Sequence, residues 1–117
     1  MRNQPNKLQI LRNIDVDESG DAGVTKPCQL FCIVAQNMTA ATNLYLKIYD
    51  TVGAPTVGTT TPKMTIPLKP AVQPVIIPID GGADFTAGVG LGATTGVADN
   101  DTGAPGANEV IVNLFYK

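Results

Sequence analysis

Hydrophobic and polar residues alternate along much of this chain with the two-residue period of β-strands. The clearest stretch is Asn43–Asp50, where Leu44, Leu46 and Ile48 alternate with more polar neighbours. Such alternation indicates a half-buried strand with one apolar face and one solvated face. We take this strand as the rigid support around which the rest of the fold is organised.

The same pattern predicts six further strands, which are expected at residues 7–16, 27–37, 63–69, 72–79, 85–93 and 109–117. The segment 27–37 is almost continuously apolar, which favours a strand that is buried on both faces or one that faces a second layer. The segment 109–117 is apolar on both sides, which favours a central strand. The segments 63–69 and 72–79 contain Pro67, Pro74 and Pro78, and proline has no N–H for a strand ladder. We therefore place these two strands at sheet edges. Their inward side chains are expected to be Met64, Ile66, Leu68, Val75, Ile77 and Ile79.

The connections between these strands are rich in Gly, Pro, Thr and Asp. Turns are predicted at 15–25 and 80–84, and two long loops are predicted at Thr51–Pro62 and Thr94–Asn108. No stretch of helical length has a 3.6-residue period. The predicted fold is all-β, a single antiparallel β-sandwich that is jelly-roll-like or Ig-like, with about seven to eight strands. Residues 1–117 are expected to form one domain with a short flexible N-terminal arm at residues 1–6.

One predicted strand has a row of glycines on one face. Within Phe85–Ala93, the residues Gly88, Gly90 and Gly92 alternate with larger residues. Glycine weakens a strand, so the row requires a physical reason, and close packing of another segment over that face supplies one. The covering segment is the chain's own loop or arm, or a neighbouring subunit, and we favour the chain itself.

Composition and charge narrow the range of partners. The 117-residue chain has a net charge of −2, and charged residues make up only 15% of it. Nucleic acid and anionic membranes are not expected partners, because both require clustered Lys and Arg. No apolar run reaches the length of a signal peptide or a membrane span. We therefore expect a protein made in the cytoplasm of the cell that produces it. The low charged content leads us to expect that partners cover part of its surface.

The two cysteines, Cys28 and Cys32, are predicted to remain reduced. They lie four residues apart on one expected strand. That separation is about 13 Å along a strand, beyond the roughly 7 Å limit for a disulfide. We interpret both as small apolar side chains.

The sequence offers no catalytic constellation. It has no histidine, and its only serine, Ser19, lies in an acidic segment without a base to activate it. We therefore predict that the protein is not an enzyme, and we assign no catalytic, cofactor-binding or metal-binding residue.

The strongest hint of a ligand is a partial calcium-loop pattern. Asp15, Asp17, Ser19 and Gly20 take the first, third, fifth and sixth places, but Lys26 stands where a bidentate Glu is required. A solvated acidic turn is the favoured interpretation. Asp99 and Asp101 form a weaker version of the pattern, which is more typical of turns.

Two blocks, Leu44–Pro67 and Phe85–Lys117, resemble small β-sandwich virion proteins of tailed bacteriophages, of the capsid decoration or cement type. The features that carry the resemblance are Tyr45–Asp50, Ala54–Pro62, Gly88–Gly96, Asp99–Thr102 and Asn113–Lys117. The two blocks make up about half of the chain, and the resemblance implies no catalytic residue.

The resemblance implies a decoration protein that binds the outer surface of the major capsid protein shell and stabilises it. Such a protein is located on the capsid exterior of the virion and self-associates, with a homotrimer expected. The expected contact segments are residues 1–6, Thr51–Pro62 and Thr94–Asn108, with Tyr45 and Tyr49 at a subunit contact. The alternatives are a neck, tail or head-fibre component and a ligand-binding β-sandwich, for example a calcium-assisted carbohydrate module.

Overall fold

The computed structural model describes residues 7–70 and 73–117 and contains eight β-strands, in agreement with the all-β prediction. The strands are β1 (Gln9–Asn13), β2 (Asp21–Val24), β3 (Cys28–Asn37), β4 (Leu44–Tyr49), β5 (Met64–Leu68), β6 (Val75–Phe85), β7 (Val89–Thr94) and β8 (Val110–Tyr116). The predicted arm at residues 1–6 and the start of the strand predicted at 72–79 lie outside the described residues. In the described ranges no helix exists that is long and apolar enough to cross a membrane.

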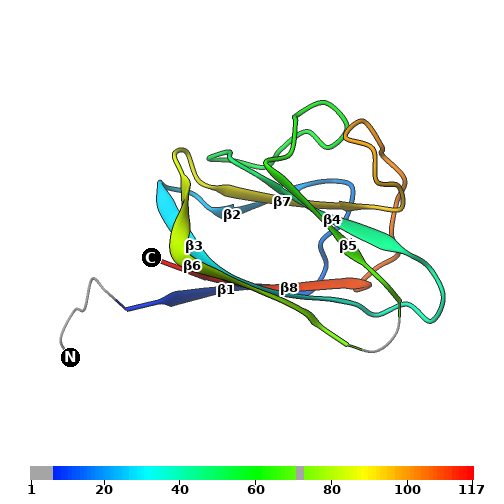
Figure 1. Ribbon diagram of the computed structural model, residues 1–117. Coiled ribbons are helices and arrows are strands. Elements are labelled where there is room, and N and C mark those ends of the chain that lie inside the picture. The colour runs from blue at the N-terminus through cyan, green and yellow to red at the C-terminus, as the bar shows by residue number, and fades with distance from the viewer. Residues whose placement is uncertain (1–6, 71–72) are drawn as a thin grey trace.

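The strands form two four-stranded antiparallel sheets packed face to face (Figure 1). One sheet has the order β1-β8-β3-β6 and the other has the order β2-β7-β4-β5. The first strand thus pairs with the last, the second with the seventh, the third with the sixth and the fourth with the fifth. An antiparallel ribbon folded over itself in this way is a jelly roll, which decides between the two sandwich types left open by the sequence.

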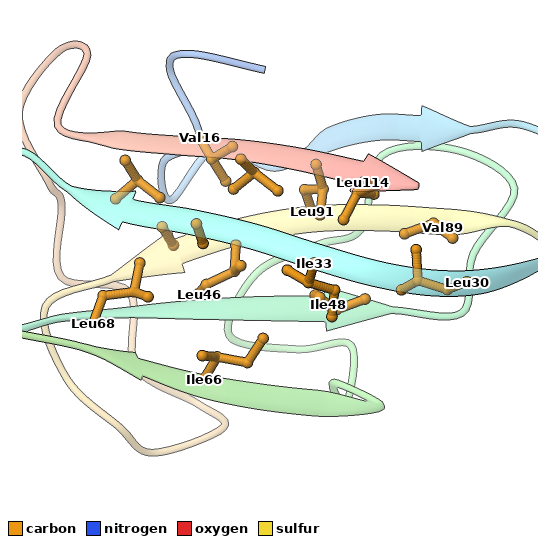
Figure 2. Close-up of a cluster of buried hydrophobic side chains, with 14 of the residues drawn as sticks. Val16, Leu30, Ile33, Leu46, Ile48, Ile66, Leu68, Val89, Leu91 and Leu114 are labelled. Atoms are coloured by element: carbon orange, nitrogen blue, oxygen red, sulfur yellow. The ribbon is translucent and has the colours of Figure 1, made fainter. Parts of the chain in front are cut away.

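The core lies between the two sheets and is built by alternate residues of both (Figure 2). In β4 the side chains of Leu44, Leu46 and Ile48 are fully buried, as the alternation predicted. The fully buried side chains that face them come from the other sheet and include Leu30, Ile33, Val110, Val112 and Leu114. Interdigitation of two inner faces in this way is how an antiparallel sandwich buries enough apolar surface to be stable.

The predicted edge and central positions are confirmed. In the part of the chain that the structure describes, strands β5 and β6, which contain Pro67 and Pro78, each pair with one neighbour. Strands β3 and β8 are central in their sheet. Of the two alternatives for segment 27–37, the structure supports a strand that faces a second layer, because one side of β3 is buried against the other sheet while its outward side chains remain partly exposed.

Two predicted turns contain strand. The acidic segment 15–25 includes β2, which pairs with β7 through Asp21 and Leu91. The segment 80–84 lies inside β6, because Gly81 and Gly82 adopt positive φ and let the strand bulge against β3 without ending the pairing. Consequently the strand predicted at 85–93 is divided, with Phe85 ending β6 and Val89 beginning β7.

Candidate functional site

The outer face of the β2-β7-β4-β5 sheet is covered by the chain's own loop 51–62. A Cβ atom added to Gly90 would lie 2.3 Å from Thr51 Oγ1 and 2.9 Å from Pro55 Cδ. A Cβ atom added to Gly92 would lie 2.7 Å from Val57 Cγ2. The prediction that the glycine row makes room for the chain itself is therefore confirmed.

The second long loop, 94–108, lies beside the first, as Figure 1 shows in green and orange. A Cβ atom added to Gly58 would lie 2.5 Å from Thr102 Cγ2. The carboxylate of Asp101 accepts hydrogen bonds from the backbone N–H groups of Gly96 (3.2 Å) and Gly103 (2.8 Å) and so fixes the loop internally. Two of the three predicted contact segments thus form one continuous surface, which we call the loop platform (51–62 and 94–108).

Two polar side chains of β4 are buried beneath the platform. Lys47 has no exposed surface, and its ammonium group donates a hydrogen bond to the carbonyl oxygen of Ala98. Burial lowers the pKa of Lys47, and the carboxylates of Asp101 and Asp99 partly oppose this shift. This buried hydrogen bond ties the second loop to the centre of the sheet.

The expectation that Tyr49 contacts a neighbouring subunit is wrong. Its side chain has no exposed surface, because the platform covers it. Its hydroxyl has no hydrogen-bond partner among the described protein atoms, and burial, followed by the negative charge of Asp99, raises its pKa. Tyr45 lies on the same strand face and stays partly exposed, so its predicted subunit contact remains a prediction.

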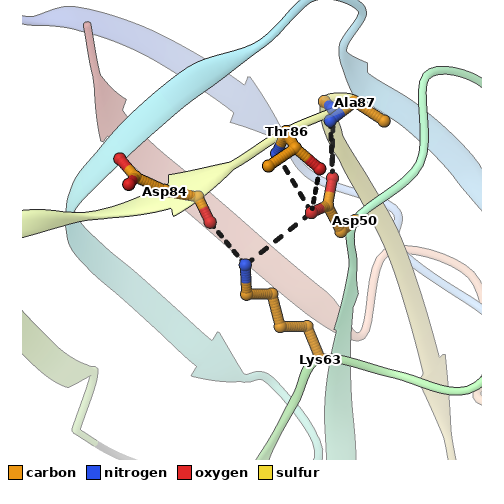
Figure 3. A network of polar contacts seen from close by, with 6 residues as sticks. Asp50, Lys63, Asp84, Thr86 and Ala87 are labelled. Atoms are coloured by element: carbon orange, nitrogen blue, oxygen red, sulfur yellow. Dashed lines mark hydrogen bonds and ion pairs between the residues drawn. The ribbon is translucent and has the colours of Figure 1, made fainter.

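The turn between β6 and β7 is held by Asp50, which directly follows β4 (Figure 3). Its carboxylate accepts hydrogen bonds from the backbone N–H groups of Thr86 (3.0 Å), Ala87 (2.8 Å) and Gly88 (3.3 Å), and it lies 3.7 Å from the ammonium group of Lys63. Desolvation raises the pKa of Asp50, but these hydrogen bonds outweigh it and lower the pKa to about 2. The hydrogen bonds and the ion pair of the Asp50 carboxylate therefore stabilise the turn between β6 and β7.

The acidic segment 15–21 does not bring its carboxylates together around one point. Asp15 accepts a hydrogen bond from the N–H of Asn108, Asp17 from the N–H and hydroxyl of Ser19, and Asp21 from the amide of Asn13. Within residues 7–70 and 73–117 no group of three or more His, Cys, Asp or Glu side chains is placed to hold a metal ion. The segment is thus a hydrogen-bonded turn that leads into β2.

Both cysteines are free, as predicted, but they point to opposite faces of β3. A β-bulge at Phe31 shifts the register between Leu30 and Cys32. Cys28 therefore points into the core, whereas Cys32 is partly exposed on the outer face. Four residues without a bulge would have placed both thiols on one face.

The outer face of the β1-β8-β3-β6 sheet carries several exposed apolar side chains. Within the described chain, no loop covers this face (Figure 1). Ile10 and Ile76, on the two edge strands, are 63% and 61% exposed. Between them lie side chains of β8 and β3 that are partly exposed. We call this surface the bare face, and its apolar residues are Leu8, Ile10, Ile14, Cys32, Val34, Ile76, Pro78, Ile111 and Phe115.

Over residues 7–70 and 73–117 the molecule is an eight-stranded antiparallel jelly roll, with loops of the chain packed on the outer face of one sheet and no described loop on the outer face of the other. No protein-family model, no curated protein and no solved structure matches this chain. The similarity to phage virion proteins therefore stays a prediction. The bare face was missed at the sequence level, although the alternation of Leu8, Ile10 and Ile14 was a signal for it.

Proposed function

We propose that this chain is a non-enzymatic virion structural protein that decorates the capsid of a tailed bacteriophage. In this proposal it binds the outer surface of the major capsid protein shell and stabilises the shell by adhesion. The observation that supports the proposal best is the loop platform. Its two segments belong to the blocks that resemble phage virion proteins, and they lie side by side on one side of the molecule.

The platform is well suited to binding a protein surface because it is held rigidly. Its first loop packs on Gly90 and Gly92, and its second loop is fixed by Asp101 and by the buried Lys47. A preorganised loop loses little conformational entropy when it binds, so weak contacts to a repeating shell suffice for adhesion. Each loop also presents one large exposed hydrophobic side chain, Val52 at 60% and Val97 at 59%.

The test is co-sedimentation of the purified chain with capsids of the phage that encodes it. The native chain is expected to pellet with the capsids, and the double variant Val52→Asp, Val97→Asp is expected to bind at least about 10-fold more weakly, because two desolvated charges would oppose contact. Met38→Asp is the matched control, since Met38 is 51% exposed in the connection between β3 and β4. A native chain that stays in the supernatant, or that binds glycans only in the presence of calcium, would overturn the proposal.

A further inference from the structure

The bare face is organised in cross-strand rows that run across all four strands. In one row Ile10 is opposite Phe115, Phe115 is opposite Cys32, and Cys32 is opposite Pro78. All four of these residues are apolar and at least partly exposed. The row is therefore a continuous apolar band across the width of the sheet.

The next row is apolar only in its β3 and β6 half. Arg12 is opposite Asn113, Asn113 is opposite Val34, and Val34 is opposite Ile76. Arg12 is the only formally charged side chain in the two rows, and it lies on edge strand β1. An arginine at an edge can keep its guanidinium group in solvent while its stem packs, so a partner on this face would not bury an unpaired charge.

An antiparallel sheet that ends a sandwich normally presents polar side chains to water. Large exposed apolar patches on soluble proteins mark contact surfaces. Four strands spaced by roughly 4.8 Å and about seven residues long give a sheet face of roughly 450 Å² in projection, with the polar residues around the apolar rows included. Two such faces in contact cover about 900 Å² in projection. Their solvent-accessible area is larger than their projected area, so the buried area reaches the roughly 1,000 Å² expected of a specific interface.

We propose that the bare face packs on the same face of a second copy of this chain, related by a twofold axis. The product is a homodimer, which we call the pair. Two sheets with the same twist pack face to face at about −30° and about 10 Å apart, so the face is complementary in shape to itself. A twofold contact uses one patch on both partners, which matches a molecule with one such face. Association through sheet edges is disfavoured at β5 and β6, which contain Pro67 and Pro78.

This inference goes beyond capsid binding, because pairing requires no capsid. It also differs from the homotrimer that the sequence resemblance implies. A closed trimer joins two different surfaces of each subunit, whereas the bare face alone generates a pair.

The mass of the full chain in solution, measured by sedimentation equilibrium, tests the proposal. The native chain is expected at twice the 12.2 kDa of one chain. The double variant Ile10→Glu, Ile76→Glu is expected to be a monomer. Charges placed in an apolar contact should raise the dissociation constant of the pair at least about 100-fold. Both positions are more than half exposed, so the variant should fold, and circular dichroism checks that it does. The matched control is Val97→Glu, an exposed valine on the loop platform, which should remain a pair.

Cys32 gives a second readout that does not depend on mass. Its thiol lies within the apolar band and is partly exposed in the single chain. In the native pair its alkylation by iodoacetamide should be slower than in the Ile10→Glu, Ile76→Glu variant, whereas Cys28 should be protected in both. A monomeric native chain, a trimer, or a pair that persists in the double variant with unchanged Cys32 alkylation would overturn the proposal.

Discussion

The Asp50 carboxylate provides the sharpest test of what stabilises this fold. The substitution Asp50→Asn removes the negative charge while keeping the size of the side chain. The native carboxylate accepts three backbone N–H bonds at the turn between β6 and β7 and lies 3.7 Å from the Lys63 ammonium group. The amide oxygen of the new Asn side chain can accept only some of these hydrogen bonds. Its NH₂ group is itself a donor and cannot hydrogen-bond to the backbone N–H groups that it would face.

The magnitude follows from the pKa of Asp50, which desolvation raises but the hydrogen bonds lower from 3.8 to about 2. At about 1.4 kcal/mol per pKa unit, the ionised group contributes about 2 kcal/mol to stability, and solvent screening keeps the contribution at or below that value because the side chain is 23% exposed. Because the folded pKa lies below the unfolded one, this contribution is complete above about pH 5 and is lost as the pH falls through 3.8 towards 2.

Urea unfolding, followed by circular dichroism at equal protein concentrations, measures the effect. Asp50→Asn is expected to be about 2 kcal/mol less stable than the native chain near pH 7, and the difference should shrink to under about 0.5 kcal/mol near pH 2. Asp80→Asn, which changes an exposed aspartate of β6, is the control and should change stability little. A difference between Asp50→Asn and the native chain that stays constant with pH would refute the reasoning.

Three further predictions concern the covered face. Gly90→Ala should lower stability by about 2 kcal/mol in thermal or urea unfolding, because the new methyl group would lie 2.9 Å from the Pro55 ring, whereas Gly53→Ala, with open space around it, should not. Tyr49→Phe should leave stability unchanged or raise it by about 1 kcal/mol, because it removes a buried hydroxyl without a partner, and a clear loss would contradict this account. Burial lowers the pKa of Lys47 from 10.5, so native stability should rise relative to Lys47→Met as the pH rises from neutral towards 10.5, and a pH-independent difference would contradict it.

The β-sandwich was predictable because apolar and polar residues alternate regularly in its clearest strands, and this alternation indicates which side chains are buried. Leu44, Leu46 and Ile48 face the core as their period indicated, and the edge positions followed from Pro67 and Pro78. These inferences succeed because they depend on local geometry and on the missing N–H of proline.

Features that depend on distant pairing were not predictable. Strand β2 has only four residues, and it forms because β7 offers it a partner. The bulge at Phe31 places Cys28 and Cys32 on opposite faces of β3, and no residue type marks it. The bare face was hidden for the same reason, because alternation separates the two faces of β1 without showing which face the core covers.

The site was predictable only in part. The loops were found from their Gly, Pro and Thr content, and the need for a close neighbour was found from Gly88, Gly90 and Gly92. The burial of Tyr49 was not found, because alternation placed it on a face that is outward in the sheet but covered by the loop platform. Coverage by a loop is a tertiary property that strand periodicity does not encode.

The two proposals together predict how many copies of this chain a capsid binds at saturation. Pairing through the bare face places the two loop platforms on opposite outer sides of a four-layer pair, about 30 Å of stacked sheets apart at roughly 10 Å per layer spacing. A flat shell then contacts only one platform of each pair, and the other platform points away from it. The Ile10→Glu, Ile76→Glu variant should therefore still bind capsids, but the mass of chain bound at saturation should fall to about half that of the native chain. Equal saturation by both proteins would show that the shell engages both chains of a pair or that no pair forms, whereas complete loss of binding would place the capsid contact on the bare face itself.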